Sequence, residues 1–201
     1  AICLAMALND LKLSEWQPEK LRFYLAGNAM QAAEIYLLLR RHLRQIVLTP
    51  MDKGEPCYLT PDHLMPVGFG AEETILPYPS QSFPGYRLIQ EYFILPEKFL
   101  FLDLGGWPKW TRRGESNRFE IRFELHNPPF ALPRVRKESF ALAATPAINL
   151  FPHSADPVRL DHHKSEYLVR PSGSNDRNYQ AYSVTQVTGF ATVGDTTAPT
   201  I

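Results

Sequence analysis

The stretch Ser82–Leu104, SFPGYRLIQEYFILPEKFLFLDL, joins a helix pattern directly to a strand pattern. Pro84 suits the first turn of a helix, where its missing N–H leaves no hydrogen bond unmade. Tyr86, Ile89 and Phe93 recur at helical spacing, so we expect them to form one apolar face that packs in the core. Alanine at Tyr86 or Phe93 is therefore expected to unfold the chain.

The second half of this stretch predicts a strand in the core. Pro96 ends the helix, because it cannot donate a backbone hydrogen bond and its ring clashes with the preceding turn. The large apolar residues of Phe99–Leu104 then indicate a strand that is buried on both faces. The residues that we assign to this structural motif are Phe83, Pro84, Gly85, Tyr86, Glu91, Phe93, Pro96 and Phe99.

The composition is that of a globular protein without an excess of charge. Hydrophobic residues make up 44% of the 201 residues and charged residues 21%, which is typical of a folded domain. Lys and Arg together number 21, as do Asp and Glu, so no net field attracts nucleic acid. The cluster Arg40, Arg41, His42 and Arg44 ends a predicted helix, where cations favour the negative end of the helix dipole. We therefore expect no nucleic-acid partner.

The cysteine content, the length of the apolar runs and the chain ends give expectations about the redox compartment, membrane insertion and the extent of the chain. Two cysteines, Cys3 and Cys57, make no disulfide framework, which favours a reducing compartment. No apolar run approaches the roughly 20 residues that a membrane-spanning helix requires, so we expect no membrane insertion. The chain begins in an apolar stretch without Met and ends in a polar tail, as expected for an internal fragment of a longer protein.

The periodicity predicts an α+β fold dominated by antiparallel sheet. Lys20–Ala26 and Arg118–Leu125 alternate apolar and polar residues, which is typical of half-exposed antiparallel strands. Asn28 followed by Gln31 is a capping pattern that opens a helix. Together with the helix after Pro84, this gives two principal helices and sandwich-like β subdomains.

The domain organisation follows from the loop-rich middle of the chain. We expect residues 1–60 to form a first subdomain with a β-hairpin and a helix. Residues 61–81 are interrupted by proline and glycine and predict a connection. Residues 82–195 then form a helix and a β-rich subdomain, and residues 196–201 a disordered tail.

The C-terminal third predicts three further strands. Val158–Leu160, Glu166–Arg170 and Tyr179–Thr188 are rich in β-branched or aromatic residues, and the last is the strongest of them. Asn175–Asn178 predicts a turn.

Few residues suggest chemistry. His153, Asp161, His162 and His163 form the one cluster that suggests a metal site, but His162 and His163 point to opposite faces of a strand and cannot both bind one ion. Asp161 and His163 share a face, and a metal hydrolase that uses these two residues is an alternative that metal analysis tests. No catalytic motif is present, and we expect no enzyme activity, no cofactor and no small-molecule ligand.

The charges of the opening stretch have a structural interpretation. Glu91 and Asp103 do not form a supported acid–base pair. Carboxylates beside Arg87 or Lys98 more often make structural ion pairs, and we interpret them in this way.

Two tryptophans form the candidate interface. Trp107 and Trp110 lie on a predicted hairpin connection beside Arg112 and Arg113, and these residue types dominate interface hot spots. Closure of the hydrophobic core over the hairpin is an equally good interpretation. In a β-sandwich binding module the same tryptophans would form a carbohydrate platform.

Three long and unusual strings occur in collinear order, at residues 82–104, 145–169 and 179–189. The second and third read TPAINLFPHSADPVRLDHHKSEYLV and YQAYSVTQVTG. Together the three resemble the TssF family, also called VasA or ImpG, whose members are baseplate subunits of the bacterial type VI secretion system. Ala144 departs from the pattern, because many members have Cys there, which changes one small core residue.

The resemblance implies a scaffold. TssF-like proteins form baseplate wedges with TssG and TssK, near TssE and the spike, in the cytoplasm where the baseplate docks at the inner-membrane complex. The wedge helps start assembly of a contractile apparatus that delivers effectors. The family implies neither catalysis nor a cofactor, and exposed apolar surfaces are expected on a fragment.

Overall fold

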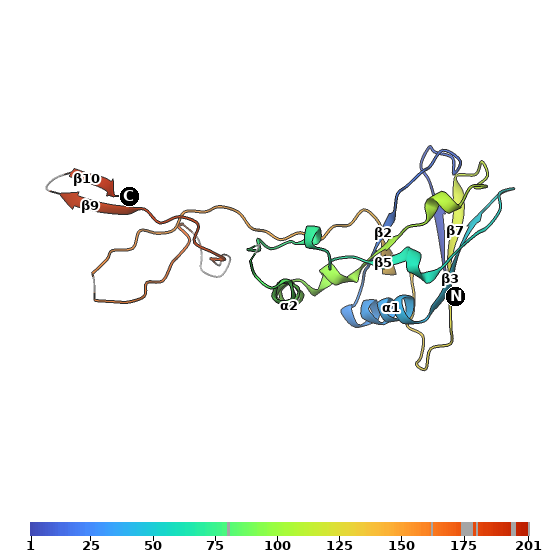
Figure 1. Cartoon of the computed structure of the whole chain (residues 1–201), viewed down its shortest axis with the longest axis horizontal. Helices are drawn as coiled ribbons and strands as arrows, with labels where there is room; N and C mark the ends of the chain where they lie inside the picture. The colour runs from blue at the N-terminus through green and yellow to red at the C-terminus, as the bar shows by residue number, and fades with distance from the viewer. Residues whose placement is uncertain (80, 162, 174–178, 180, 194–195, 201) are drawn as a thin grey trace. The chain divides into compact units, whose positions relative to one another are not determined.

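The chain forms two compact units, residues 1–148 and 149–201. The computed structural model describes the chain except for residues 80, 162, 174–178, 180, 194–195 and 201, and the side chains of residues 191–201 are left out of the description (Figure 1).

The first unit contains two four-stranded antiparallel sheets (Figure 1). The first sheet has the order β1 (Ile2–Ala7), β7 (Arg118–Leu125), β3 (Leu43–Pro50), β4 (Cys57–Leu59). The second sheet has the order β5 (Leu64–Pro66), β6 (Phe101–Leu104), β2 (Leu21–Leu25), β8 (Phe140–Ala141). The expected mixture of helix and mostly antiparallel sheet is confirmed.

Two α-helices, among the residues described, accompany the sheets. The helix α1 (Ala29–Arg41) begins at the expected cap, where the Asn28 side chain accepts a hydrogen bond from the Met30 N–H. The helix α2 (Pro84–Ile94) has Pro84 in its first turn and ends before Pro96, as the sequence predicts. In the part of the chain that the structure describes, five short 3₁₀ helices connect the larger elements: η1 (Pro61–His63), η2 (Ala71–Glu73), η3 (Pro96–Leu100), η4 (Trp107–Lys109) and η5 (Lys137–Ser139).

The central strand β7 follows the alternation in its sequence. Phe119, Ile121 and Phe123 are fully buried, whereas Arg118 and Arg122 are exposed. Alternate side chains of a strand point to opposite faces, so β7 presents its apolar face to the core and its charges to water.

Both sheets contribute to one hydrophobic core. Phe23 from β2 contacts Phe123 from β7 edge-on, with ring centroids 6.5 Å apart. Ile35 and Leu39 of α1 pack in the same cluster. The arrangement is therefore one sandwich with a helix against it.

This shared core corrects the expected subdomains. Strands from residues 1–60 and from residues 82–195 lie side by side in both sheets, so these ranges do not form separate units. The physical reason is that β1 and β3 both pair with β7, which lies far from them in sequence. The division between compact units falls after Ile148 instead.

The strand β6 is buried on both faces, as expected. Leu102 and Leu104 enter the core, while the Phe101 ring packs against Tyr24 at 4.7 Å. On the same face as Phe101, the Asp103 carboxylate receives two hydrogen bonds from the Arg22 guanidinium.

The second unit contains a hairpin of β9 (Gly189–Val193) and β10 (Thr196–Thr200). The expected disordered tail is therefore wrong for Thr196–Thr200. Val158–Leu160 and Glu166–Arg170, and the described residues of Tyr179–Thr188, are not strands. A strand needs a hydrogen-bonded neighbour, and among the described residues of this region only Ala155 and Pro171 form an isolated bridge. The predicted turn at 175–178 lies outside the described residues.

Candidate interaction surface

The helix α2 buries its charged side and exposes its apolar side. Glu91 is 0% exposed and Arg87 3%, whereas Tyr86 is 70% exposed and Phe93 80%. The expectation that Tyr86, Ile89 and Phe93 face the core is therefore wrong. The charged residues occupy the inner face because they find partners there.

The Glu91 carboxylate is the centre of these contacts. One oxygen accepts hydrogen bonds from the backbone N–H groups of Ile75 and Leu76, at 2.9 and 3.3 Å. The other oxygen pairs with the ammonium of Lys98, which is 1% exposed. Glu91 thus ties α2 both to η3 and to the loop that precedes the helix.

Arg87 lies one turn before Glu91 and binds the same loop. Its guanidinium donates to the carbonyl oxygens of Phe69 and Gly70, at 3.2 and 3.1 Å. One of its nitrogens lies 3.9 Å from the Glu91 carboxylate. The predicted interpretation of Arg87, Glu91 and Lys98 as structural ion pairs is confirmed.

The surroundings of Glu91 favour its charged form. Burial raises the pKa of this carboxyl, but hydrogen bonds from Lys98 and from the two backbone N–H groups outweigh burial. The net result is a pKa below the ordinary value of a glutamate. The Glu91 carboxyl is therefore ionised at neutral pH.

Asp103 belongs to a separate ion-pair cluster. Arg22 holds its two oxygens with a pair of hydrogen bonds of 2.7 and 2.8 Å, and Lys20 lies 2.8 Å away. Burial raises the pKa of Asp103, but the hydrogen bonds and charges of Arg22 and Lys20 lower it by a larger amount. The pKa of Asp103 is therefore below the ordinary value of an aspartate. Arg22 also lies 3.8 Å from the Glu73 carboxylate, so two carboxylates compensate the two cations of the cluster.

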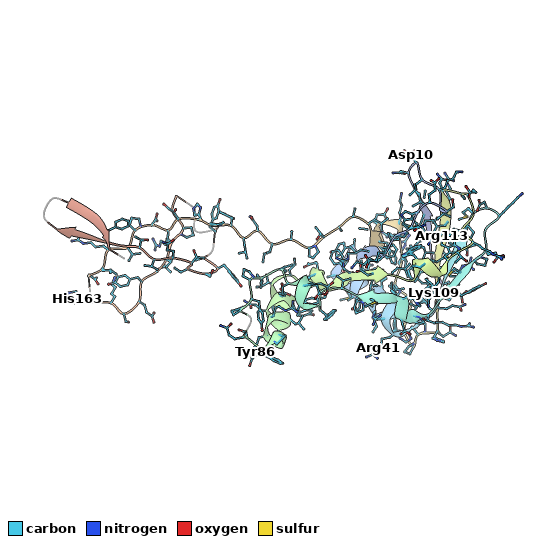
Figure 2. All side chains as sticks on the ribbon, turned by 45° about the horizontal axis from the view of Figure 1, so that its top comes forward. Asp10, Arg41, Tyr86, Lys109, Arg113 and His163 are labelled. Carbon is cyan, nitrogen blue, oxygen red and sulfur yellow. The ribbon has the colours of Figure 1, made fainter. Side chains whose placement is uncertain are left out.

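The outer side of α2 is an uncharged, aromatic-rich surface. Figure 2 shows Tyr86 on the outside of the helix. The exposed apolar side chains, which we call the α2 surface, are Phe83, Tyr86, Ile89, Tyr92, Phe93 and Ile94. The expectation of exposed apolar surface is met here, on residues that the sequence had assigned to the core.

The tryptophans of the predicted interface are core residues. Trp107 is 0% exposed and its indole N–H donates to the Leu104 carbonyl, while that of Trp110 donates to the Glu55 carbonyl, both at 2.8 Å. Gly106 has a φ of 82°, and a Cβ there would collide with His63, so glycine permits the turn that leads Trp107 inward. Of the two open interpretations, closure of the core is the correct one.

The two arginines beside the tryptophans differ. Arg113, labelled in Figure 2, is buried and donates to the carbonyl oxygens of Trp16, Trp107 and Trp110. Burial lowers the pKa of this guanidinium. Arg112 is exposed and pairs with Glu55. Arg112 is thus the one residue of the predicted four that is accessible at the surface.

Burial of Trp107 and Trp110 removes the aromatic platform that a carbohydrate module would need.

In the second unit, the Tyr167 hydroxyl donates to the Asp161 carboxylate at 2.7 Å. Among the residues that the structure describes, no three His, Cys, Asp or Glu side chains gather closely enough to hold a metal ion. His162 lies outside those residues.

Within the described part of the chain, no helix combines the length and the apolar character needed to cross a membrane.

The sequence matches one protein family along almost its whole length. The family model described as "Type VI secretion system, TssF" covers residues 1–200.

Two individual relatives agree with this match. The chain is 31% identical over 173 residues to the type VI secretion system component TssF1 of Pseudomonas aeruginosa, an alignment that covers 85% of the chain and 28% of the relative. It is also similar to a chain in the cryo-electron microscopy structure of the TssK-TssF-TssG baseplate subcomplex, with a TM-score of 0.64 and 30% identity. That similarity covers 85% of this chain and 32% of the other, so the chain spans less than a third of either relative.

Proposed function

This chain belongs to the TssF family of the type VI secretion system, and on that premise we propose that it is a structural component of the baseplate wedge. In this role it scaffolds assembly of the contractile apparatus that delivers effectors. The observation that carries the proposal is the similarity to a chain of the TssK-TssF-TssG subcomplex over 85% of the sequence.

The proposal includes partners and a location. The name of the related subcomplex supports TssG-type and TssK-type subunits as direct partners. TssE and the spike would lie nearby. The baseplate would be cytoplasmic and would dock at the inner-membrane complex.

We assign the chain no reaction. The buried charged groups Arg87, Glu91 and Lys98 are engaged with one another and with backbone groups. Buried titratable groups of an active site are expected instead to face a cleft that admits substrate. A scaffold role uses such charges to fix the orientation of elements.

Co-purification tests the proposed function. The tagged chain would be co-expressed with the TssG-type and TssK-type subunits of its own organism, and we expect it to elute with at least one of them in size-exclusion chromatography. An unrelated tagged domain of similar size is the control. Elution of the chain apart from both subunits would contradict the proposal.

A further inference from the structure

We propose that residues 142–144 form a strap that lengthens the strand β8 by pairing with the uncovered part of the β2 edge. In the structure β8 contains only Phe140–Ala141, whereas its neighbour β2 spans Leu21–Leu25. The inference goes beyond the scaffold role and does not depend on it, because the strap and the strand that receives it belong to this chain.

The first observation is an unfinished ladder of backbone hydrogen bonds. In the second sheet β2 lies between β6 and β8. The pairing of β2 with β6 runs from Leu21 to Tyr24, but the pairing with β8 includes only Tyr24 and Leu25. The β2 edge from Leu21 to Phe23 is therefore not covered by β8. Such an edge presents backbone N–H and C=O groups that can receive another strand segment.

The second observation is that the register already fits. The last pair of the ladder is Tyr24 with Ala141. The same antiparallel register places the next two residues of the chain opposite Phe23 and Arg22, in that order. The strap therefore needs no insertion or slip to continue the ladder.

The hydrogen-bonding phase of the ladder also fits. The Ala26 N–H donates to the Ser139 carbonyl at 3.1 Å, which identifies this as a hydrogen-bonded pair. In an antiparallel ladder every second pair is of this kind. The positions two and four residues before Ala26 are then hydrogen-bonded pairs as well, and the second of them is Arg22 with Ala143. Both backbone groups of Arg22 on this side would gain a partner when the strap closes.

The third observation is a single kink that keeps the strap off β2. Ala143 has a φ of 54°, in the left-handed region. An L-residue with a Cβ is strained there, and alanine has no side-chain polar group that could offset the strain. A strand requires extended backbone, so this residue turns the chain away directly after the ladder ends. Rotation of Ala143 to an extended conformation would relieve the strain and permit the pairing.

The chain stays close to β2 after the kink. Thr145 and Pro146 line the same surface hollow as Lys20 and Arg22. Closure of the strap is therefore a short movement. Pro146 has no backbone N–H, so the added pairing ends before it.

Closure would also bury an exposed apolar side chain. Leu142 is 46% exposed, although it directly follows two residues of the sheet. Directly opposed residues of two strands have their side chains on the same face. Opposite Phe23, which is 1% exposed, Leu142 would lie on the core face. The uncovered edge and the exposed leucine thus complement one another.

The place of the strap in the chain gives closure a consequence. The boundary between the two compact units follows Ile148, four residues after the strap. A closed strap holds residues 142–144 on β2, so fewer free residues connect the second sheet to the second unit. The strap thereby sets the length of that connection.

Substitutions at Ala143 test the inference. Ala143→Val disfavours the kink, because a β-branched residue favours extended backbone, and Ala143→Gly permits the kink without strain. Ala147→Val, at an exposed position beyond Pro146, is the matched control. Amide hydrogen exchange of the 201-residue chain, followed by NMR, reports on the Arg22 N–H. We expect this amide to exchange at least about tenfold more slowly in Ala143→Val than in Ala143→Gly, and Ala147→Val to match wild type.

Two internal readouts accompany this measurement. The amides of Leu21 and Phe23 lie on the β6 side of β2, so their equal protection in all the proteins shows that the sheet is intact. Phe23 and Leu142 would form a pair without hydrogen bonds, whose Cα atoms lie close together. A nuclear Overhauser effect between their Hα atoms is therefore expected in Ala143→Val. Wild type against Ala143→Gly repeats the comparison without a larger side chain, and the Arg22 amide should again exchange more slowly in wild type.

Three results would overturn the inference. The first is equal exchange of the Arg22 amide in wild type, Ala143→Val and Ala143→Gly while the sheet is intact. The second is slow exchange without the contact between Phe23 and Leu142, which would mean that another segment covers the edge. The third is protection of Arg22 that rises with protein concentration, which would assign the edge to a second copy of the chain.

Discussion

Glu91 makes the stability of the chain depend on pH. Its pKa is lowered in the folded chain, whereas an unfolded glutamate titrates at about 4.3. The folded state therefore binds fewer protons in this range, and the stabilisation is complete above the unfolded pKa and is lost as pH falls through the folded pKa. At neutral pH we expect Glu91→Gln to cost about 3 kcal/mol, because Lys98 is left buried without its counter-charge.

Urea unfolding of wild type and Glu91→Gln across this range measures the effect. The difference between their free energies of unfolding should be largest near about pH 7 and should shrink as the pH falls through the lowered pKa of Glu91, below which the wild-type carboxyl is also neutral. Glu97→Gln, at an exposed position in η3, controls for the loss of a carboxylate. A difference that stays constant with pH would argue against ionised Glu91 as the source of the stability.

Arg113 gives a second prediction at the scale of one residue. Its planar guanidinium reaches the carbonyls of three tryptophans at once, and a lysine ammonium does not match this fork. We expect Arg113→Lys to lower the free energy of unfolding by about 1–3 kcal/mol, because at least one buried carbonyl loses its donor. Arg112→Lys, at the exposed neighbouring position, should change it by less than about 0.5 kcal/mol. Equal effects in thermal unfolding would contradict the burial of Arg113.

At the scale of elements, the ends of α2 were predictable and its orientation was not. Pro84 and Pro96 act on the backbone of their own neighbours, so sequence alone locates the helix. Which side faces inward depends on partners outside the helix, namely Lys98 and the backbone of residues 69–76. The sequence predicts that Glu91 pairs with a nearby cation. It does not predict that this pairing turns the apolar side of α2 away from the core.

The orientation of α2 gives a prediction at this scale. Because the Phe93 side chain is exposed, Phe93→Ala should change the free energy of unfolding by less than about 0.5 kcal/mol. Phe23→Ala, which removes a fully buried ring of β2, should cost about 3–5 kcal/mol. Chemical denaturation of the two variants compares these values. If Phe93→Ala loses as much stability as Phe23→Ala, the apolar side of α2 must pack in the core, and the orientation described here would be wrong.

At the scale of the whole molecule, the class of fold could be predicted but not its partition. Alternation in β7 identifies a half-exposed strand, yet nothing local says that its neighbours are β1 and β3, which lie far away in sequence. The tryptophans likewise admitted two interpretations, because their burial depends on tertiary contacts. Phe119 packs against both rings, and Trp16 packs against Trp107 from a distant segment of the chain. For the described residues between 149 and 188, β propensity predicted strands that the structure does not contain, because propensity supplies no neighbouring strand.

The shared core makes the two sheets of the first unit interdependent. Phe123 of β7 contacts Phe23 of β2 and stacks on Phe140 of β8, so one ring connects the two sheets. We expect Phe123→Ala to cost about 3–5 kcal/mol and to destabilise both sheets in a single transition. Urea unfolding followed by tryptophan fluorescence, which reports the cluster beside Phe119, and by far-ultraviolet circular dichroism should give coincident curves. Leu132→Ala, at an exposed leucine, is the control. If the sheets were independent subdomains, Phe123→Ala would lower the unfolding midpoint of one sheet and leave the midpoint of the other unchanged. Two separated transitions would therefore contradict the shared core.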